Sequence, residues 1–220
     1  MKKSVISKIS IICTVLCLSF SCERDGEIVF SQTGVPVDLG LSVKWATCNI
    51  GASVPEEYGD YFAWGETDPM RKETYHLTTY KYWDGKEQKM TKYNNNDTIL
   101  TLELEDDAAY VNMGAEWRIP TLEEWIELDK HCTWTWTTLN GVKGYQVTGP
   151  NGQSIFFPAA GFWKGSTLER EGENGVFMTN KRNESNYNSY YGFGFRSNST
   201  YTFNGGARFY DACTVRAVVR

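Results

Sequence analysis

The order of the patterned segments along the chain constrains its fold more than any other feature of the sequence. Two short segments carry helix signals. They follow an N-terminal strand pattern and precede a long part, after Cys132, in which only strand patterns occur. This order predicts an α+β domain, with two helices packed on mixed, mostly antiparallel short strands. The composition stays even from Val35 onward and shows no internal repeat, so we expect a single domain over residues 36–220.

Both helix signals are capping patterns. Asp106 or Asp107 can cap a short helix, and Gly114 would close it as a left-handed terminus. Thr121 and Glu124 form a capping box, in which each side chain accepts a hydrogen bond from the backbone amide of the other residue. The apolar residues that define this second helix, which we expect to end near His131, are Leu122, Trp125, Ile126 and Leu128.

Alternation of apolar and polar residues predicts the strands. Residues 37–45 alternate throughout, which indicates one half-buried strand, and residues 61–64 indicate a second. Residues 67–100 show no clean period, so we expect them to run over the surface as a long excursion. Further strands are expected at 144–148 and 154–157, joined by an Asn-Gly turn at 149–152, and at 176–178, 191–196, 200–203 and 214–219.

The N-terminal segment is typical of an export signal. Three lysines precede an apolar run of about twelve residues, whereas a membrane-spanning helix needs roughly twenty. Residues 18–22 resemble a bacterial lipobox, in which Cys22 takes a lipid and becomes the new N-terminus, so we expect residues 1–21 to be a lipoprotein signal peptide. The alternative is an ordinary secreted protein in which Cys22 is a plain thiol.

An acidic tether is expected to follow over residues 22–35. Residues 23–27 resemble the signal that sends lipoproteins of Bacteroides-type bacteria to the outer face of the outer membrane, although any solvated linker could have this composition. We therefore predict an outer-membrane lipoprotein that is exposed at the cell surface and held there by its lipid anchor.

The charge of the chain excludes one class of partner. Its formal net charge is −5, and loss of the three leader lysines would take it to −8, which is the wrong sign for binding nucleic acid. Only two histidines are present, His76 and His131, so little material is available for histidine catalysis or a zinc site. We expect no metal and no cofactor.

Three cysteines lie in the predicted domain: Cys48, Cys132 and Cys213. Export permits a disulfide, and an odd number leaves one thiol unpaired. The spacing does not decide which pair forms. If the last strand lies beside the first, Cys48–Cys213 is the natural pair.

Six blocks of the sequence form a recognisable series, at residues 37–52, 58–67, 105–109, 117–121, 157–161 and 214–218. Together they resemble the Fibrobacter succinogenes major paralogous domain, a family widespread in Bacteroides surface lipoproteins. The resemblance covers nearly all of the chain after the tether. It implies a C-type-lectin-like fold, shared with formylglycine-generating enzymes and with retroelement-diversified receptors, and it implies no particular activity.

The resemblance raises the question of catalysis. Formylglycine-generating enzymes use a close pair of reactive cysteines and a bound metal, whereas Cys213 has no second cysteine near it in this sequence. The chain also contains no Gly-x-Ser-x-Gly elbow, no Cys-x-x-Cys and no phosphate-binding glycine loop. We therefore expect no enzyme, and a degenerate oxidase of this type is the less favoured alternative.

Residues 177–206 have the composition of a binding surface. Asn, Tyr, Ser and Gly account for 18 of these 30 residues, and this mixture is typical of antibody-like contact surfaces and of diversified receptors. Loops between short strands favour the same residues, so plain loop chemistry is an equally simple interpretation. The candidate ligand contacts are Tyr187, Asn188, Tyr190, Tyr191, Arg196, Tyr201, Asn204 and Arg208.

Other side chains indicate cation binding, sugar stacking or modification less strongly. The Glu-Pro-Asn and Trp-Asn-Asp signatures of calcium-binding lectins are absent, and the acidic residues at 103–107 are expected to cap a helix. A weak cation site at 171–175 is a minor alternative. Trp134, Trp136 and Trp163 could stack on sugar rings, but packing in the core is the expected role. Residues 97–99 resemble an O-glycosylation acceptor of Bacteroides-type exported proteins, with Thr98 as the modified residue.

Together these features predict a surface lipoprotein that binds an extracellular glycan or protein without catalysis. The alternative is a structural or assembly component of the envelope that has no specific ligand.

Overall fold

A five-stranded sheet forms the centre of the protein. A computed structural model describes residues 34–69, 76–185 and 188–220, and at 204–206 it describes the backbone alone. All neighbouring strands of the central sheet are antiparallel except β11 and β14, which are parallel. In order across the sheet the strands are β13 (Ser199–Arg208), β12 (Ser189–Arg196), β11 (Asn174–Arg182), β14 (Cys213–Thr214) and β3 (Tyr61–Phe62).

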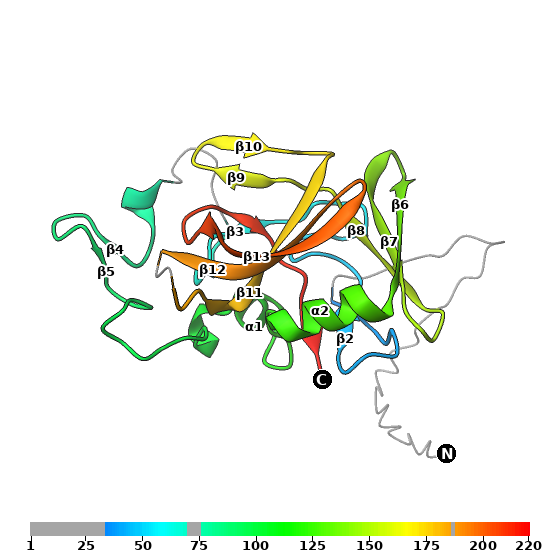
Figure 1. The fold of residues 1–220 in the computed structure, drawn as a ribbon, viewed down its shortest axis with the longest axis horizontal. Helices are drawn as coiled ribbons and strands as arrows, with labels where there is room; N and C mark the ends of the chain where they lie inside the picture. Colours follow the sequence, from blue (N-terminus) through cyan, green and yellow to red (C-terminus); the bar gives the residue numbers. More distant parts are fainter. Residues whose placement is uncertain (1–33, 70–75, 186–187) are drawn as a thin grey trace, which may run out of the picture.

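Smaller sheets and two helices surround this centre (Figure 1). A mixed α+β architecture with two helices is therefore confirmed. One three-stranded sheet has the order β1 (Pro36–Val37), β2 (Lys44–Ala46), β15 (Val218–Val219), and another has the order β6 (Thr133–Leu139), β7 (Val142–Thr148), β8 (Ser154–Pro158). Two-stranded hairpins are formed by β4 (Trp83–Asp84) with β5 (Lys89–Met90) and by β9 (Phe162–Lys164) with β10 (Thr167–Glu169). The helices are α1 (Ala108–Met113) and α2 (Leu122–His131), with 3-10 turns η1 (Leu77–Thr79) and η2 (Leu104–Asp106).

Both helices begin where the capping patterns predict. The Asp107 carboxylate accepts from the amides of Ala109, at 2.8 Å, and Tyr110, and Gly114 closes α1 at a φ of 108°. In α2, the Thr121 hydroxyl accepts from the Glu124 amide at 3.2 Å, while the Glu124 carboxylate accepts from the Thr121 amide at 2.9 Å. Satisfying these amides, which have no partner inside a helix, fixes the first turn of each helix.

Helix α2 covers one face of the central sheet and lies below it in Figure 1. Its Trp125 is fully buried and stacks on Phe193 of β12, with ring centroids 4.8 Å apart. A second aromatic cluster lies on the other side of the sheet, where Trp64 stacks on Phe209 at 4.7 Å. The numerous aromatic residues therefore form two cores separated by the sheet.

The prediction of a single strand over residues 37–45 is wrong. The chain forms two short strands there, β1 and β2, which pair with each other around a bend. Gly40 has a φ of 77°, and its amide donates to the Asp38 carboxylate at 2.7 Å, which turns the backbone. The Ser42 hydroxyl donates to Glu127 of α2 and holds the bend against the helix.

The segment expected to run over the surface contributes to the core instead. Tyr80 and Tyr93 are buried, and the Tyr93 ring packs against Trp64 at 5.0 Å. The carboxylate of Asp106, in η2, accepts from the Tyr93 hydroxyl at 2.7 Å and from the ammonium groups of Lys81 and Lys92. Burial alone would raise the pKa of Asp106, but these hydrogen bonds outweigh it and hold the pKa well below its usual value.

The two ends of the described chain meet in one sheet, because β15 pairs with β2. Cys213, however, lies in β14 of the central sheet, while Cys48 follows β2. Cys48, Cys132 and Cys213 are all free thiols, so the pair expected between Cys48 and Cys213 does not form in this structure.

The predicted export signal, Cys22 and the tether up to residue 33 lie outside the described residues. The last two tether residues are described, and the Val35 carbonyl accepts a hydrogen bond from the Thr47 amide at 3.0 Å. Among the residues that are described, we find no helix with the length and apolar character needed to cross a membrane.

Candidate functional site

The predicted contact residues do not form one site. Strands β12 and β13 pair from Ser189 opposite Arg208 to Arg196 opposite Ser199. At about 3.3 Å per residue, this hairpin separates its two ends by more than 20 Å. Asn188 and Arg208 are at one end, whereas Arg196 and Tyr201 are at the other. Tyr187 and the side chain of Asn204 lie outside the description.

Tyr190 belongs to the core, which corrects its assignment as a ligand contact. Its side chain is 0% exposed and stacks parallel to Trp64, and its hydroxyl lies 3.6 Å from the Cys213 sulfur. Burial raises the pKa of Cys213 to about 12, so this thiol is neutral and inaccessible. Tyr191 is half-buried, with the Lys181 ammonium 5.8 Å from its ring.

The remaining candidate residues have distinct surroundings. Arg208 is exposed and donates to the Tyr210 hydroxyl at 2.5 Å, while the exposed Asn188 accepts from the Phe209 amide through its backbone carbonyl. Thr98 is exposed, as a modified residue must be. Neither observation assigns a ligand.

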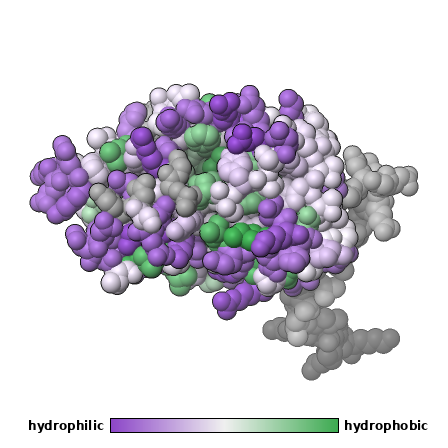
Figure 2. All heavy atoms as spheres, in the orientation of Figure 1, coloured by the Kyte–Doolittle hydropathy of each residue, from purple (hydrophilic) through white to green (hydrophobic). Residues whose placement is uncertain are grey.

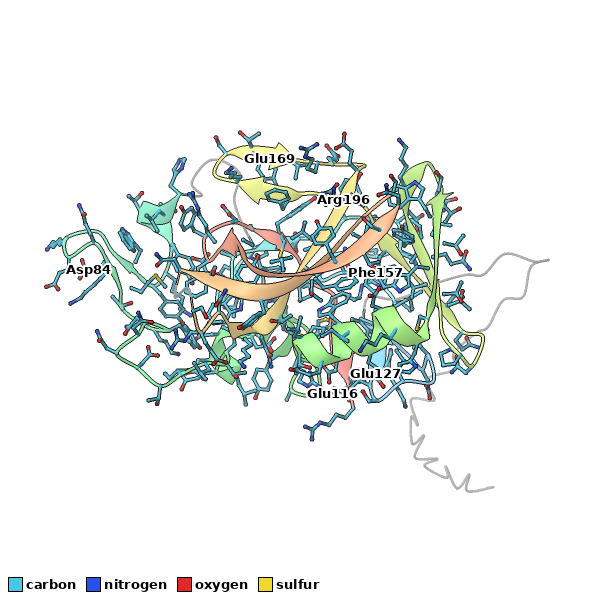
Figure 3. The ribbon with its side chains drawn as sticks, viewed as in Figure 1. Asp84, Glu116, Glu127, Phe157, Glu169 and Arg196 are labelled. Carbon is cyan, nitrogen blue, oxygen red and sulfur yellow. The ribbon has the colours of Figure 1, made fainter. Side chains whose placement is uncertain are left out.

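An open cavity of about 640 Å³ lies at the turn end of the β12–β13 hairpin. Three segments line it: the β6–β7 hairpin, the turn between β10 and β11, and the turn between β12 and β13. Figure 3 shows Arg196 between the β9–β10 hairpin and the β6–β7 hairpin. The lining residues are Trp136, Lys143, Arg170, Gly172, Glu173, Asn174, Arg196 and Ser197.

Arg196 is held at the cavity by the sheet beneath it. Its guanidinium lies 5.3 Å from the centre of the Tyr201 ring, and the Tyr145 hydroxyl donates to its backbone carbonyl. The Tyr201 ring in turn covers Gly194 of β12, where a Cβ atom would come within 2.8 Å of it. Glycine at 194 therefore lets this aromatic ring lie flat on the sheet and support the arginine.

The side chain of Trp136 forms part of the wall of the same cavity. It is half-buried, and its ring packs edge-on against Tyr145 at 5.1 Å and against Phe195 at 6.3 Å. Figure 2 shows side chains of intermediate hydropathy gathered over the end of the molecule where Figure 1 places β6 and β7. The cavity thus offers one partly accessible aromatic ring in otherwise polar surroundings.

Three cations and a single carboxylate line the cavity. Glu173 pairs with Arg170 at 3.1 Å, whereas neither Lys143 nor Arg196 forms an ion pair with any described residue. All four side chains are exposed. Because the protein as a whole is acidic, this local excess of positive charge distinguishes the cavity from the rest of the surface.

Chemical groups for catalysis are sparse around the cavity. Hydrolysis of a glycosidic bond normally needs two carboxyl groups, and only Glu173 is among the lining residues. Across the described part of the chain, no three His, Cys, Asp or Glu side chains are grouped to hold a metal ion. Hydrogen bonding, stacking and attraction of anions are the interactions that this arrangement can provide.

Sequence reasoning identified one of these residues as a contact, Arg196, and considered a second, Trp136, for sugar stacking while favouring a packing role. Lys143 and Arg170 were not among the candidates, because nothing in their local sequence distinguishes them from other exposed charges. Glu173 lies in the acidic segment 171–175, which the sequence offered as a weak cation site and not as a ligand contact. The alternation of Trp134 and Trp136 along one strand was the available signal for an aromatic wall.

No protein-family model matches the chain, and no curated protein and no solved structure is significantly similar to it.

Proposed function

We propose that the protein is a lipid-anchored, surface-exposed lipoprotein of the outer membrane that binds an extracellular ligand, a glycan or a protein, without catalysis. We further propose that its domain is C-type-lectin-like and related to the Fibrobacter succinogenes major paralogous domain, on the basis of the sequence blocks described above. The ligand site in this proposal is the cavity beside Arg196, at the turn end of the β12–β13 hairpin.

One observation carries this proposal. The cavity combines a partly accessible aromatic ring, Trp136, with two cations, Lys143 and Arg196, that form no ion pair within the described part of the chain, and its walls are β-hairpins and short turns. A volume near 640 Å³ falls within the usual range for small-ligand sites. A purely structural component would have no need to leave this ring and these cations accessible together.

The cysteine geometry supports binding over the oxidase alternative. A reactive cysteine needs an accessible, deprotonated thiol, whereas Cys213 is buried with a raised pKa. Cys48 is buried as well, and burial raises its pKa too. Neither thiol borders the cavity.

The proposal is tested with a glycan and protein array probed by the full-length protein in detergent, with and without a chelator. We expect binding that survives the chelator. Trp136→Ala and Arg196→Gln should each weaken it at least about tenfold, the loss expected for a charge-assisted hydrogen bond or a buried ring contact.

Both variants should melt within a few degrees of the wild type, because Trp136 is only half-buried and Arg196 is exposed. Lys86→Gln, an exposed cation at the distant β4–β5 turn, is the matched control and should bind normally. An array without signal, or binding that neither variant changes, would favour the structural role.

A further inference from the structure

We infer that the ligand of this cavity is an acidic saccharide, one that carries a carboxylate or sulfate group on its sugar ring. This inference rests on the proposed function and specifies the chemistry that the same cavity would recognise.

The charge of the lining points to an anionic group. Two of its three cations, Lys143 and Arg196, are left without a carboxylate partner among the described residues. The guanidinium of Arg196 is planar and can bind a carboxylate or sulfate through two parallel hydrogen bonds. Its support on Tyr201 reduces the freedom that the side chain would lose on binding.

The rest of the lining points to a sugar ring. Only Trp136 offers a large apolar face, so a predominantly hydrophobic ligand would leave most of the lining unmatched. A sugar ring presents C–H groups that pack on an aromatic face and hydroxyl groups that need hydrogen-bond partners. Asn174 and Ser197 supply such partners beside the tryptophan.

Glu173 is an internal competitor for the anionic group. Its carboxylate pairs with Arg170 across 3.1 Å, and both side chains are more than 60% exposed. An anionic ligand that approaches Arg170 must displace this carboxylate or bind beside its negative charge. Removing the charge from Glu173 should therefore strengthen the binding of an acidic saccharide, whereas it should leave the binding of a neutral one unchanged.

The test compares the charged and the neutral form of the same saccharide. Titration calorimetry of the full-length protein in detergent is run with tetragalacturonate and with its fully methyl-esterified form. Glucuronate-containing and sulfated tetrasaccharides, each with a neutral counterpart, extend the panel. We expect at least one acidic saccharide to bind about tenfold or more tightly than its neutral counterpart, with affinity falling as salt rises.

Variants assign that binding to the cavity. Arg196→Gln should lower the affinity for the acidic form at least about tenfold, and it should change the affinity for the neutral form little. Glu173→Gln should raise affinity for the acidic form about two- to threefold, the size of one exposed charge interaction. Glu87→Gln removes an exposed carboxylate at the β4–β5 turn and is the matched control. It should change the affinity for neither the acidic nor the neutral form.

Each other outcome overturns the inference in a recognisable way. Equal binding of acidic and neutral forms, both lost in Trp136→Ala, would reject the acidic class but leave the proposed function intact. If an oligoglutamate peptide binds as tightly as the acidic saccharides, the inferred ligand class changes from an acidic saccharide to an acidic protein segment. If no saccharide of the panel binds, the acidic-saccharide inference fails, and the proposed function then depends on the protein half of the array.

Discussion

Two adjacent residues of the same type can have different roles in the structure, as Tyr190 and Tyr191 show. The sequence offers both as members of an Asn- and Tyr-rich surface, yet the Tyr190 ring lies within the aromatic core around Trp64. Tyr191 is half-buried beside Lys181. Adjacent residues of a strand point to opposite faces, so composition alone cannot separate a contact residue from a core residue.

This difference predicts contrasting stabilities. Tyr190→Ala should lower the free energy of unfolding by about 3–5 kcal/mol, because it empties a closely packed aromatic site. Tyr191→Ala should cost less than about 1.5 kcal/mol, since its side chain is already partly solvated. Urea denaturation measures both, and equal losses would contradict the assignment of Tyr190 to the core.

At the scale of elements, short-range signals predicted the local structure well where the interaction is itself local. The capping box of α2 and the Asp107 cap of α1 form as expected, because donor and acceptor lie within three residues of each other. The prediction for residues 37–45 was wrong, because the alternation there spans a bend that is fixed by Asp38 and by Glu127, which is distant in the sequence.

The Glu124 cap predicts a pH dependence. Burial by itself would raise the pKa of Glu124, but hydrogen bonds from Arg118 and from Thr121 lower it below its ordinary value of 4.5. A carboxylate with a depressed folded-state pKa stabilises the fold above its unfolded pKa. That stability is lost as the pH falls through the folded pKa.

Glu124→Gln keeps an oxygen that can accept from the Thr121 amide but loses the charge that pairs with Arg118, so it should destabilise the protein by about 1 kcal/mol at pH 7 and by much less at pH 3. Glu123→Gln removes the same charge from the exposed neighbouring position and should have little effect at either pH. Chemical denaturation at the two pH values gives the comparison. A loss for Glu124→Gln that is equal at both would rule out the carboxylate as its source.

At the scale of the whole molecule, the buried side chain of Arg216 joins two of the sheets. Arg216 is 1% exposed and donates to the carbonyls of Ala46, Thr47 and Phe156 and to the side-chain oxygen of Asn49. These acceptors belong to the region of β2 and to β8, which lie far from residue 216 in the sequence. Burial lowers the pKa of Arg216 to about 10, which still leaves it charged at neutral pH.

Arg216→Met should lower the free energy of unfolding by more than about 3 kcal/mol, because it leaves several buried acceptors without donors. Arg220→Met, at the exposed end of the chain, is the control and should cost less than about 0.5 kcal/mol. Thermal and urea denaturation measure the difference. A tolerated Arg216→Met would show that water replaces the arginine at these carbonyls.

The sequence by itself determined the α+β class, both helices with their caps, and the hairpin at residues 149–152, because these depend on periodicity and on contacts between near neighbours. Only the tertiary structure decided which aromatic residues are buried and that the segment before Asp106 joins the core. It also decided where the cavity lies, since Trp136, Arg170 and Arg196 come from segments separated by more than twenty residues. Long-range pairing brings such residues together, and no local pattern records it.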